Sequence, residues 1–257
     1  MRIRPILQLA DNYAYLVIDE KSGHAGVVDC ASASSVLAVI KQEGVHLTTI
    51  LPTHPHFDHT GGHRELLQQA SLEVVGHKGD GDRIPGCTVE VGEGDSIKIG
   101  NLIVHILFVP GHTQSDLAYY IADEEVVFTG DTLFAGGCGR LFEGDAEMML
   151  NSLSKLKGLP EETKVYFGHE YTKKNLQFAL TLEPKNRALH EKYEWAQQQQ
   201  REKKPTTPST IKSEKETNPF FRWASPELRS AIQNKFPNLS LTNVNVFAKT
   251  RILKDQF

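Results

Sequence analysis

The chain has 257 residues, of which 39% are hydrophobic and 23% charged, and its formal net charge is −4. This length allows one large domain or two unequal ones, and the composition is ordinary for a soluble globular protein. The weakly acidic balance argues against a protein whose main partner is nucleic acid. Three scattered cysteines, Cys30, Cys87 and Cys138, form no CxxC pair and favour a reducing compartment. No apolar run resembles a signal peptide or a membrane span, so we expect a soluble, cytoplasmic protein that does not bind membranes.

Short apolar runs separated by turn residues dominate the first 170 residues. They predict strands over residues 14–18, 25–29, 47–51, 72–75, 96–99, 102–107, 117–121, 126–129 and 164–167. Helices are expected from Ser34 or Ser35 to Gly44, over residues 63–70 and over residues 145–157. This mixture of strands, hairpins and helices indicates an α/β protein whose sheets are covered by helices, rather than a purely parallel sheet.

The chain changes character after about residue 172. Helices are predicted over residues 173–182, over residues 184–201, and from a Ser-Pro start at residues 225–226. Residues 203–217 hold Pro, Thr, Ser and charges, so we expect a surface loop there. We therefore predict two domains, a catalytic one over residues 1–172 and a mostly helical one over residues 173–257.

A histidine-rich segment follows the strand predicted to end before Pro52. His54 and His56 lie two residues apart, so an extended backbone points both imidazoles to the same side, where one metal ion can bind them. Pro55 favours this geometry because the residue before a proline is restricted to extended conformations. Asp58 and His59 follow at once and can face a different point of the same cleft. Two imidazoles beside a carboxylate and a third imidazole suggest two metal ions.

Three further positions can complete the ligand shells. His112, Asp131 and His169 each follow an apolar run and a glycine. Loops at one edge of a sheet deliver ligands to a common cleft in this way, and glycine permits the close turns that this requires. We interpret the remaining histidines as structural or surface residues, and Cys138 as a buried residue rather than a nucleophile or ligand. These histidines are His24, His46, His63, His77, His105 and His190.

The whole motif set resembles the metallo-β-lactamase superfamily and, within it, glyoxalase II, the hydroxyacylglutathione hydrolases. The HxHxDH segment with the later Gly-His, Gly-Asp and Gly-His positions carries the resemblance to the superfamily. Segments at residues 136–144, 168–172, 218–222 and 254–257 carry the resemblance to the family, which covers essentially the whole chain. The resemblance implies an αββα sandwich of two mixed β-sheets with outer helices, followed by a helical substrate-binding domain.

The same resemblance implies the ligand set and the chemistry. It places His54, His56 and His112 on the first ion, and Asp58, His59 and His169 on the second, with Asp131 bridging both. A set of nitrogen and carboxylate ligands without thiolate suits zinc, and also iron or manganese. The implied catalysis is attack on a thioester by a hydroxide held between two divalent ions, for which a thiolate is a good leaving group.

The family's substrate is S-D-lactoylglutathione, which is cleaved to D-lactate and glutathione in the second step of methylglyoxal detoxification. By similarity, the residues that bind glutathione are Arg140, Phe142, Tyr171, Arg251 and Lys254. Arg140 stands where many members have lysine, and Phe142 where many have tyrosine. Arginine keeps the charge and gains a planar fork, whereas phenylalanine loses a hydrogen-bond donor. We expect a monomer that binds a small glutathione thioester.

Other functions on the same fold stay open. One alternative is a lactonase, β-lactamase or RNase, although neither a basic arm nor a secretion signal is visible. A second is a persulfide dioxygenase, an iron oxidoreductase, which is expected to lack the long helical C-terminal half. A non-catalytic binding module ranks last because all seven ligand positions are intact.

Overall fold

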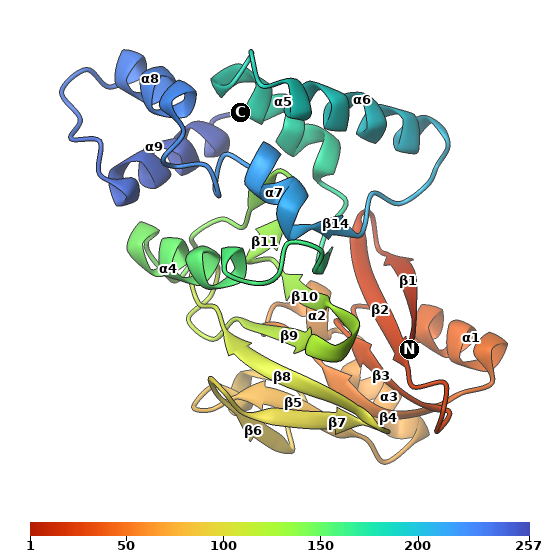
Figure 1. Cartoon of the computed structure of the whole chain (residues 1–257). Helices are drawn as coiled ribbons and strands as arrows, with labels where there is room; N and C mark the ends of the chain where they lie inside the picture. Colours follow the sequence, from red (N-terminus) through yellow and green to blue (C-terminus); the bar gives the residue numbers. More distant parts are fainter. The chain divides into compact units, whose positions relative to one another are not determined.

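The computed structural model describes residues 1–257, and the chain forms two compact units (Figure 1). The first unit comprises Met1–Phe108, Ser115–Gly130 and Tyr166–His169; the second comprises Val109–Gln114, Asp131–Val165 and Glu170–Phe257. The chain therefore passes between the units several times. The division at residue 172 concerns catalysis and substrate binding, and it stays a prediction.

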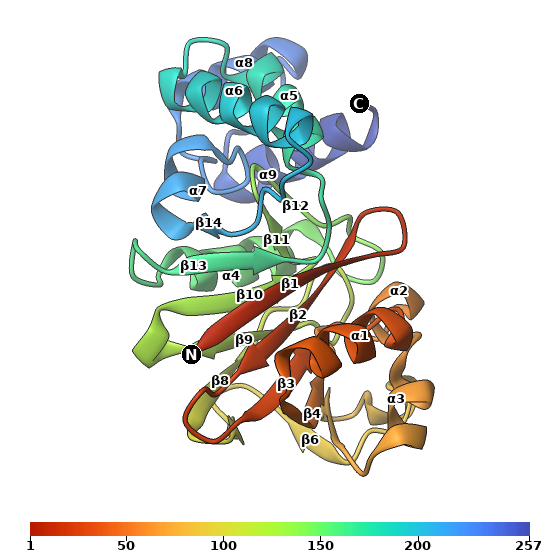
Figure 2. The same ribbon diagram turned by 90° about the vertical axis from the view of Figure 1, so that its right-hand side faces the viewer.

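The first sheet is mixed and has the strand order β1-β2-β3-β4-β5-β6 (Figure 2). Its strands are β1 (Arg2–Gln8), β2 (Asn12–Ile18), β3 (His24–Val28), β4 (His46–Leu51), β5 (Glu73–His77) and β6 (Val89–Val91). The pairs β1–β2 and β2–β3 are antiparallel hairpins, whereas β3 to β6 run parallel. The sequence pattern predicted β2 to β5 but missed the amphipathic β1 and the short β6.

The second sheet has the strand order β14-β13-β10-β9-β8-β7. Its strands are β7 (Ser96–Ile99), β8 (Leu102–Phe108), β9 (Leu117–Ile121), β10 (Val126–Gly130), β13 (Lys164–Phe167) and β14 (Ser209–Thr210). The consecutive pairs from β7 to β10 are antiparallel; short turns join β7 to β8 and β9 to β10, whereas residues 109–116 join β8 to β9. Gly26 in β3 marks where the two sheets approach, because a Cβ atom there would lie 2.6 Å from Cδ1 of Ile99 in β7.

Helices α1 (Ala33–Glu43), α2 (Phe57–Thr60) and α3 (His63–Gln69) belong to the first unit, with short 3-10 turns at Gly81–Arg83 and Ala122–Glu124. Helix α1 lies over β1 and β2 (Figure 2) and ends at Gly44, whose positive φ of 65° is the left-handed conformation that stops a helix. Val36 of α1 and Leu66 of α3 join Val27 and Ile50 of the first sheet in one buried apolar cluster. Burial of this cluster fixes the strand ends that carry the histidine-rich segment.

The second unit is mostly helical and also holds a two-stranded hairpin, β11 (Leu133–Phe134) and β12 (Gly137–Cys138). Its helices are α4 (Ala146–Lys157), α5 (Thr172–Leu182), α6 (Arg187–Arg201), α7 (Ile211–Thr217), α8 (Pro226–Lys235) and α9 (Asn243–Asp255). Ser225 caps α8 by accepting a hydrogen bond from the Leu228 amide, as its Ser-Pro start predicted. None of the helices in the structure is long and apolar enough to cross a lipid bilayer.

The prediction of a surface loop over residues 203–217 holds for residues 203–208, which form no helix or strand, and is wrong for residues 209–217. This segment contains β14 and α7, and it buries Ser209, Ile211 and Glu214. The composition misled because polar residues usually mark exposed loops, whereas the polar side chains here pair with one another inside the protein.

Candidate metal centre

The first unit brings five of the predicted ligands to the ends of its strands. His54 lies three residues beyond the end of β4, and His169 lies two residues beyond the end of β13. His56 caps α2 with an extended backbone (φ −60°, ψ 145°), and α2 carries Asp58 and His59. The sequence predicted ligands beyond strand ends; His54 and His169 lie there, whereas His56, Asp58 and His59 lie at the start of and within α2.

Asp58, His59 and His169 form a compact group in which one ligand atom from each lies within 4.8 Å of the others. The Nε2 atoms of His59 and His169 are 3.3 Å apart, and the Asp58 carboxylate lies 3.6 Å and 3.4 Å from them. Both histidines are buried. Two imidazole nitrogens and one carboxylate oxygen that converge on one point fit zinc, iron or manganese.

The HxH pair converges as its spacing predicted. Nε2 of His54 lies 3.1 Å from Nδ1 of His56, and the ring centroids are 4.6 Å apart. The His54 ring also lies beside the His59 ring, with centroids 4.1 Å apart. The two groups are therefore neighbours within the first unit.

Asp29 orients the histidine-rich segment from the end of β3. Its carboxylate lies 3.0 Å from Nδ1 of His59 and accepts hydrogen bonds from the backbone N–H and the hydroxyl of Thr53. The Thr53 hydroxyl lies in turn 3.0 Å from Nδ1 of His54. A partner on one ring nitrogen fixes the tautomer, so that the other nitrogen faces the metal. Asp29 adopts φ 51°, a left-handed conformation that aspartate tolerates better than most residues.

The turn between β1 and β2 supports Asp58 and His169. The carboxylate of Asp11 lies 2.9 Å from Nδ1 of His169, and the side chain of Asn12 donates to the Asp58 carboxylate over 3.0 Å. Our sequence interpretation missed Asp11, Asn12, Asp29 and Thr53. A carboxylate at a strand end is a weak signal, and only the folded chain shows that residues 158 positions apart, such as Asp11 and His169, meet.

The second unit holds the other two predicted ligands close together. Nε2 of His112 lies 3.6 Å from the Asp131 carboxylate, and Nδ1 of His112 lies 2.9 Å from the backbone oxygen of Arg140. Gly139 makes this approach possible, since a Cβ atom there would lie 2.2 Å from the Asp131 backbone oxygen and 2.9 Å from Nδ1 of His112. A glycine is therefore required at this position for steric reasons.

Three of the predicted substrate residues present exposed side chains in the second unit. The Phe142 ring is 59% exposed; it packs edge-on to His112 at 5.2 Å, and the Arg140 guanidinium lies over it at 5.5 Å. Tyr171 is 37% exposed and packs edge-on against Phe134.

Arg251 and Lys254, both on α9, differ in exposure. Arg251 is only 5% exposed; it donates to the Cys138 backbone oxygen over 2.8 Å and pairs with Asp255 at 2.9 Å. Lys254 is half-buried, and its pKa falls to about 8, mainly because of burial and also because Arg251 and Lys174 are near. Burial raises the pKa of the Cys138 thiol to about 11, which fits the expectation that this cysteine is not a nucleophile.

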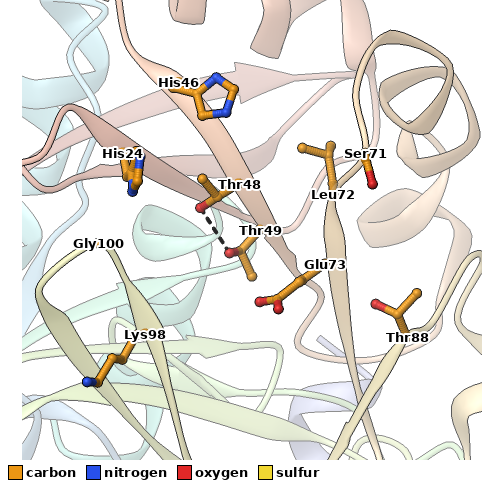
Figure 3. A pocket seen from close by; sticks show the side chains of 10 residues that line it. All are labelled: His24, His46, Thr48, Thr49, Ser71, Leu72, Glu73, Thr88, Lys98 and Gly100. Carbon is orange, nitrogen blue, oxygen red and sulfur yellow. Dashed lines mark hydrogen bonds between the residues drawn. The ribbon is translucent and has the colours of Figure 1, made fainter.

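A groove on the first unit is separate from the ligands (Figure 3). It runs over β3, β4 and β5, where His24 and His46 sit side by side with ring centroids 5.8 Å apart. Neither histidine belongs to a group of three ligand-type side chains in this structure. His63 is the first residue of α3 and is buried, which lowers its pKa to about 4. These histidines agree with the interpretation as structural or surface residues.

The comparisons with known proteins decide the family. A model described as the metallo-beta-lactamase superfamily matches residues 9–169, and one described as the hydroxyacylglutathione hydrolase C-terminus matches residues 170–257. A hydroxyacylglutathione hydrolase of Synechococcus sp. (strain JA-2-3B'a(2-13)) is 45% identical over 100% of both chains. The chain belongs to the hydroxyacylglutathione hydrolase family. The predicted family, enzyme class and αββα fold with a helical C-terminal region are thereby confirmed.

Solved structures agree with this fold. The ETHE1 protein of Myxococcus xanthus is 26% identical, with a TM-score of 0.67 and complete coverage of both chains. A second protein, TTHA1623, crystallised in a di-iron-bound form, is also 26% identical, with a TM-score of 0.61, and the match covers 84% of this chain and 98% of its own. Fold and ligand chemistry together indicate that this hydroxyacylglutathione hydrolase family member uses divalent metal ions.

Proposed function

We propose that the protein hydrolyses S-D-lactoylglutathione, and other S-(2-hydroxyacyl)glutathiones, to glutathione and the free hydroxy acid. This is the second step of methylglyoxal detoxification. Membership of the hydroxyacylglutathione hydrolase family over the full length supports the substrate class. The observation that carries the proposal is the convergence of Asp58, His59 and His169 beside the His54–His56 pair.

The proposed centre holds two divalent ions. His54, His56 and His112 would hold the first, Asp58, His59 and His169 would hold the second, and Asp131 would serve both. When bound, the two ions supply Lewis acidity, which lowers the pKa of water and polarises the thioester carbonyl. We favour zinc for this ligand set, with iron or manganese as alternatives, and the related TTHA1623 protein was crystallised with two irons.

The protein's own contribution is orientation. Asp29 holds Nδ1 of His59, Asp11 holds Nδ1 of His169, and the Arg140 backbone oxygen holds Nδ1 of His112. Each contact favours the tautomer with its proton on Nδ1, which leaves the Nε2 lone pair free to bind a cation. Because the leaving group is a thiolate, the site needs no strong protein acid, and Asp58 serves as a ligand rather than as a general base.

The proposed substrate contacts come from residues with exposed or half-buried side chains. Arg140 and Lys254 meet the carboxylates of glutathione, Phe142 packs against it, and Tyr171 supplies a hydroxyl. Arg251 is buried, so it contributes through its positive charge and through the Cys138 carbonyl that it holds. On this proposal residues 1–172 are catalytic and residues 173–257 bind the substrate. Three free cysteines support a cytoplasmic protein, and we propose a monomer.

Metal analysis paired with a substrate panel tests the proposal. The purified protein is expected to contain close to two ions per chain and to release thiol from S-D-lactoylglutathione. Lactone, β-lactam and persulfide substrates are compared at the same enzyme concentration. One iron per chain with oxygen-dependent persulfide turnover, and no thioester cleavage, would show instead a persulfide dioxygenase.

A further inference from the structure

The hairpin β11–β12 lies between Asp131 and Arg140 in the chain, and side chains of the helical region hold its backbone. Asn218 donates to the backbone oxygens of Phe134 and Gly137 over 3.1 and 3.0 Å. Asn175 donates to the Ala135 oxygen over 3.2 Å, and Arg251 donates to the Cys138 oxygen over 2.8 Å. Glu214 accepts from the Gly136 N–H over 2.8 Å. Four side chains thus engage five of the hairpin's backbone groups, and they come from three segments: α5, α7 with its C-cap, and α9.

Asn218 opens the 218–222 segment that carried part of the family resemblance and that the catalytic proposal leaves without a role. Its side chain is fully buried, and its amide nitrogen also lies 2.8 Å from a Glu214 carboxylate oxygen, so that its two N–H groups are shared among three acceptors. Its amide oxygen accepts from the Phe220 backbone N–H over 2.9 Å. An amide suits this position because it is both donor and acceptor, whereas a carboxylate would face two carbonyl oxygens and Glu214.

Glu214 is fully buried in α7, and Lys192 of α6 neutralises it at 2.6 Å. Ser209 of β14 donates to the same carboxylate oxygen, Oε1, while Oε2 accepts from Asn218 and Gly136. Both oxygens are therefore fully engaged. A buried ion pair is weak support for overall stability, but its hydrogen bonds specify one geometry.

The hairpin leads directly to the two metal ligands of the second unit. The next residue after β12 is Gly139, whose Cα lies so close to Nδ1 of His112 and the Asp131 backbone oxygen that no side chain fits. The backbone oxygen of the following residue, Arg140, lies 2.9 Å from Nδ1 of His112 and can accept a hydrogen bond from it. A shift of the hairpin would therefore move the contact that orients His112 and press on Asp131.

We propose that Asn218 and Glu214 are positioning residues that set the geometry of His112 and Asp131 through the β11–β12 hairpin. The helical region then has a task besides substrate binding, since it shapes half of the metal centre. The inference rests on the proposed role of His112 and Asp131 as ligands.

The test compares Asn218→Ala with the control Leu189→Ala. Leu189 is a fully buried residue of α6 that makes none of the hydrogen bonds to the hairpin, so its truncation destabilises the same helical region while leaving every donor and acceptor of the hairpin contacts in place. Zinc affinity is measured by competition with a chelator, and hydrogen exchange is followed over residues 131–142. We expect Asn218→Ala to bind zinc about tenfold more weakly and to exchange faster there, because loss of a supporting contact typically costs 10- to 100-fold in metal affinity. Leu189→Ala should keep wild-type zinc affinity.

Kinetics give a readout that a merely structural role would not move. For Asn218→Ala we expect kcat to fall at limiting zinc and to recover with excess zinc, while KM for the thioester stays unchanged. Glu214→Gln is the second variant if Asn218→Ala does not fold. In this variant the NH₂ group of the new amide would face another donor, either the Lys192 ammonium or the Gly136 N–H, and would lose that hydrogen bond. The same loss of zinc affinity is therefore expected.

The outcomes separate this inference from the proposed function. If the wild type binds two zinc ions and cleaves the thioester, but a folded Asn218→Ala or Glu214→Gln variant binds zinc as tightly as wild type, the positioning role is wrong and the function stands. Equal losses of affinity in Asn218→Ala and Leu189→Ala would also overturn it. If the wild type binds fewer than two ions and leaves the thioester intact, the proposed function fails instead.

Discussion

The two sets of candidate ligands are oriented by different means. In the first unit, carboxylates at strand ends and turns hold the outer nitrogens of the histidines, as Asp29 does for His59 and Asp11 for His169. In the second unit, a backbone oxygen holds His112, and helices hold that backbone. The first set is therefore sensitive to single carboxylates, and the second to the packing of a distant region.

Removal of a ligand should have the largest effect on activity. Asp58→Ala takes away the only carboxylate of the Asp58–His59–His169 group, so we expect loss of one ion and a fall in kcat/KM of about 1,000-fold. Metal content and thioester hydrolysis are measured together. Asp82→Ala, at an exposed acid of the first unit, is the control and should retain two ions and full activity. Retention of both ions by Asp58→Ala would contradict the ligand assignment.

Replacement of a supporting carboxylate should have the next largest effect. Asn at position 29 keeps the left-handed backbone but can present an N–H to Nδ1 of His59, which disfavours the required tautomer. We expect Asp29→Asn to weaken zinc binding about 10- to 100-fold. Chelator competition measures this, and hydrogen exchange of the hairpin over residues 131–142 should stay at the wild-type rate. Faster exchange of the hairpin would show that the two ligand sets are not supported independently.

This contrast also explains what the sequence could predict. His54, His56, Asp58 and His59 are adjacent in the chain, so their spacing alone predicted a shared site. The partners of Asp29 and Asp11 depend on strand order, which no local pattern specifies. The sequence did not predict the buried position of Glu214, because the polar residues around it are typical of an exposed loop. In the structure, contacts with Lys192 and Asn218 compensate for its burial.

A smaller effect is expected at the proposed glutathione contacts. Lys254→Ala removes a cation that we place beside a substrate carboxylate, so KM should rise about tenfold with kcat nearly unchanged. Lys249→Ala, on the same helix, is the control and should leave KM as it is. An unchanged KM in Lys254→Ala would remove this residue from the binding site.

The pH dependence of KM follows from the same lysine. The pKa of Lys254 lies near 8, below its ordinary value, so the side chain is cationic at lower pH and becomes neutral as pH rises through this value. The groups that face it are Arg251, Asp255, Lys174 and Cys138. Since only the cation attracts a carboxylate, KM should be flat below about pH 8 and should rise above it. Lys254→Arg keeps its charge at high pH and should abolish the rise; a rise that persists in this variant would have another origin.

The smallest effect is expected at Phe142, where the family resemblance led us to expect tyrosine. The ring is 59% exposed beside His112, so an added hydroxyl would reach solvent or substrate without disturbing the core. One neutral hydrogen bond is worth about 0.5–1.5 kcal/mol, so Phe142→Tyr should lower KM for the glutathione thioester by about two- to tenfold. Zinc affinity should not change, because the substitution leaves the Arg140 backbone oxygen and Gly139 in place. A change in zinc affinity with constant KM would instead show that Phe142 supports the metal ligand His112 and does not bind the substrate.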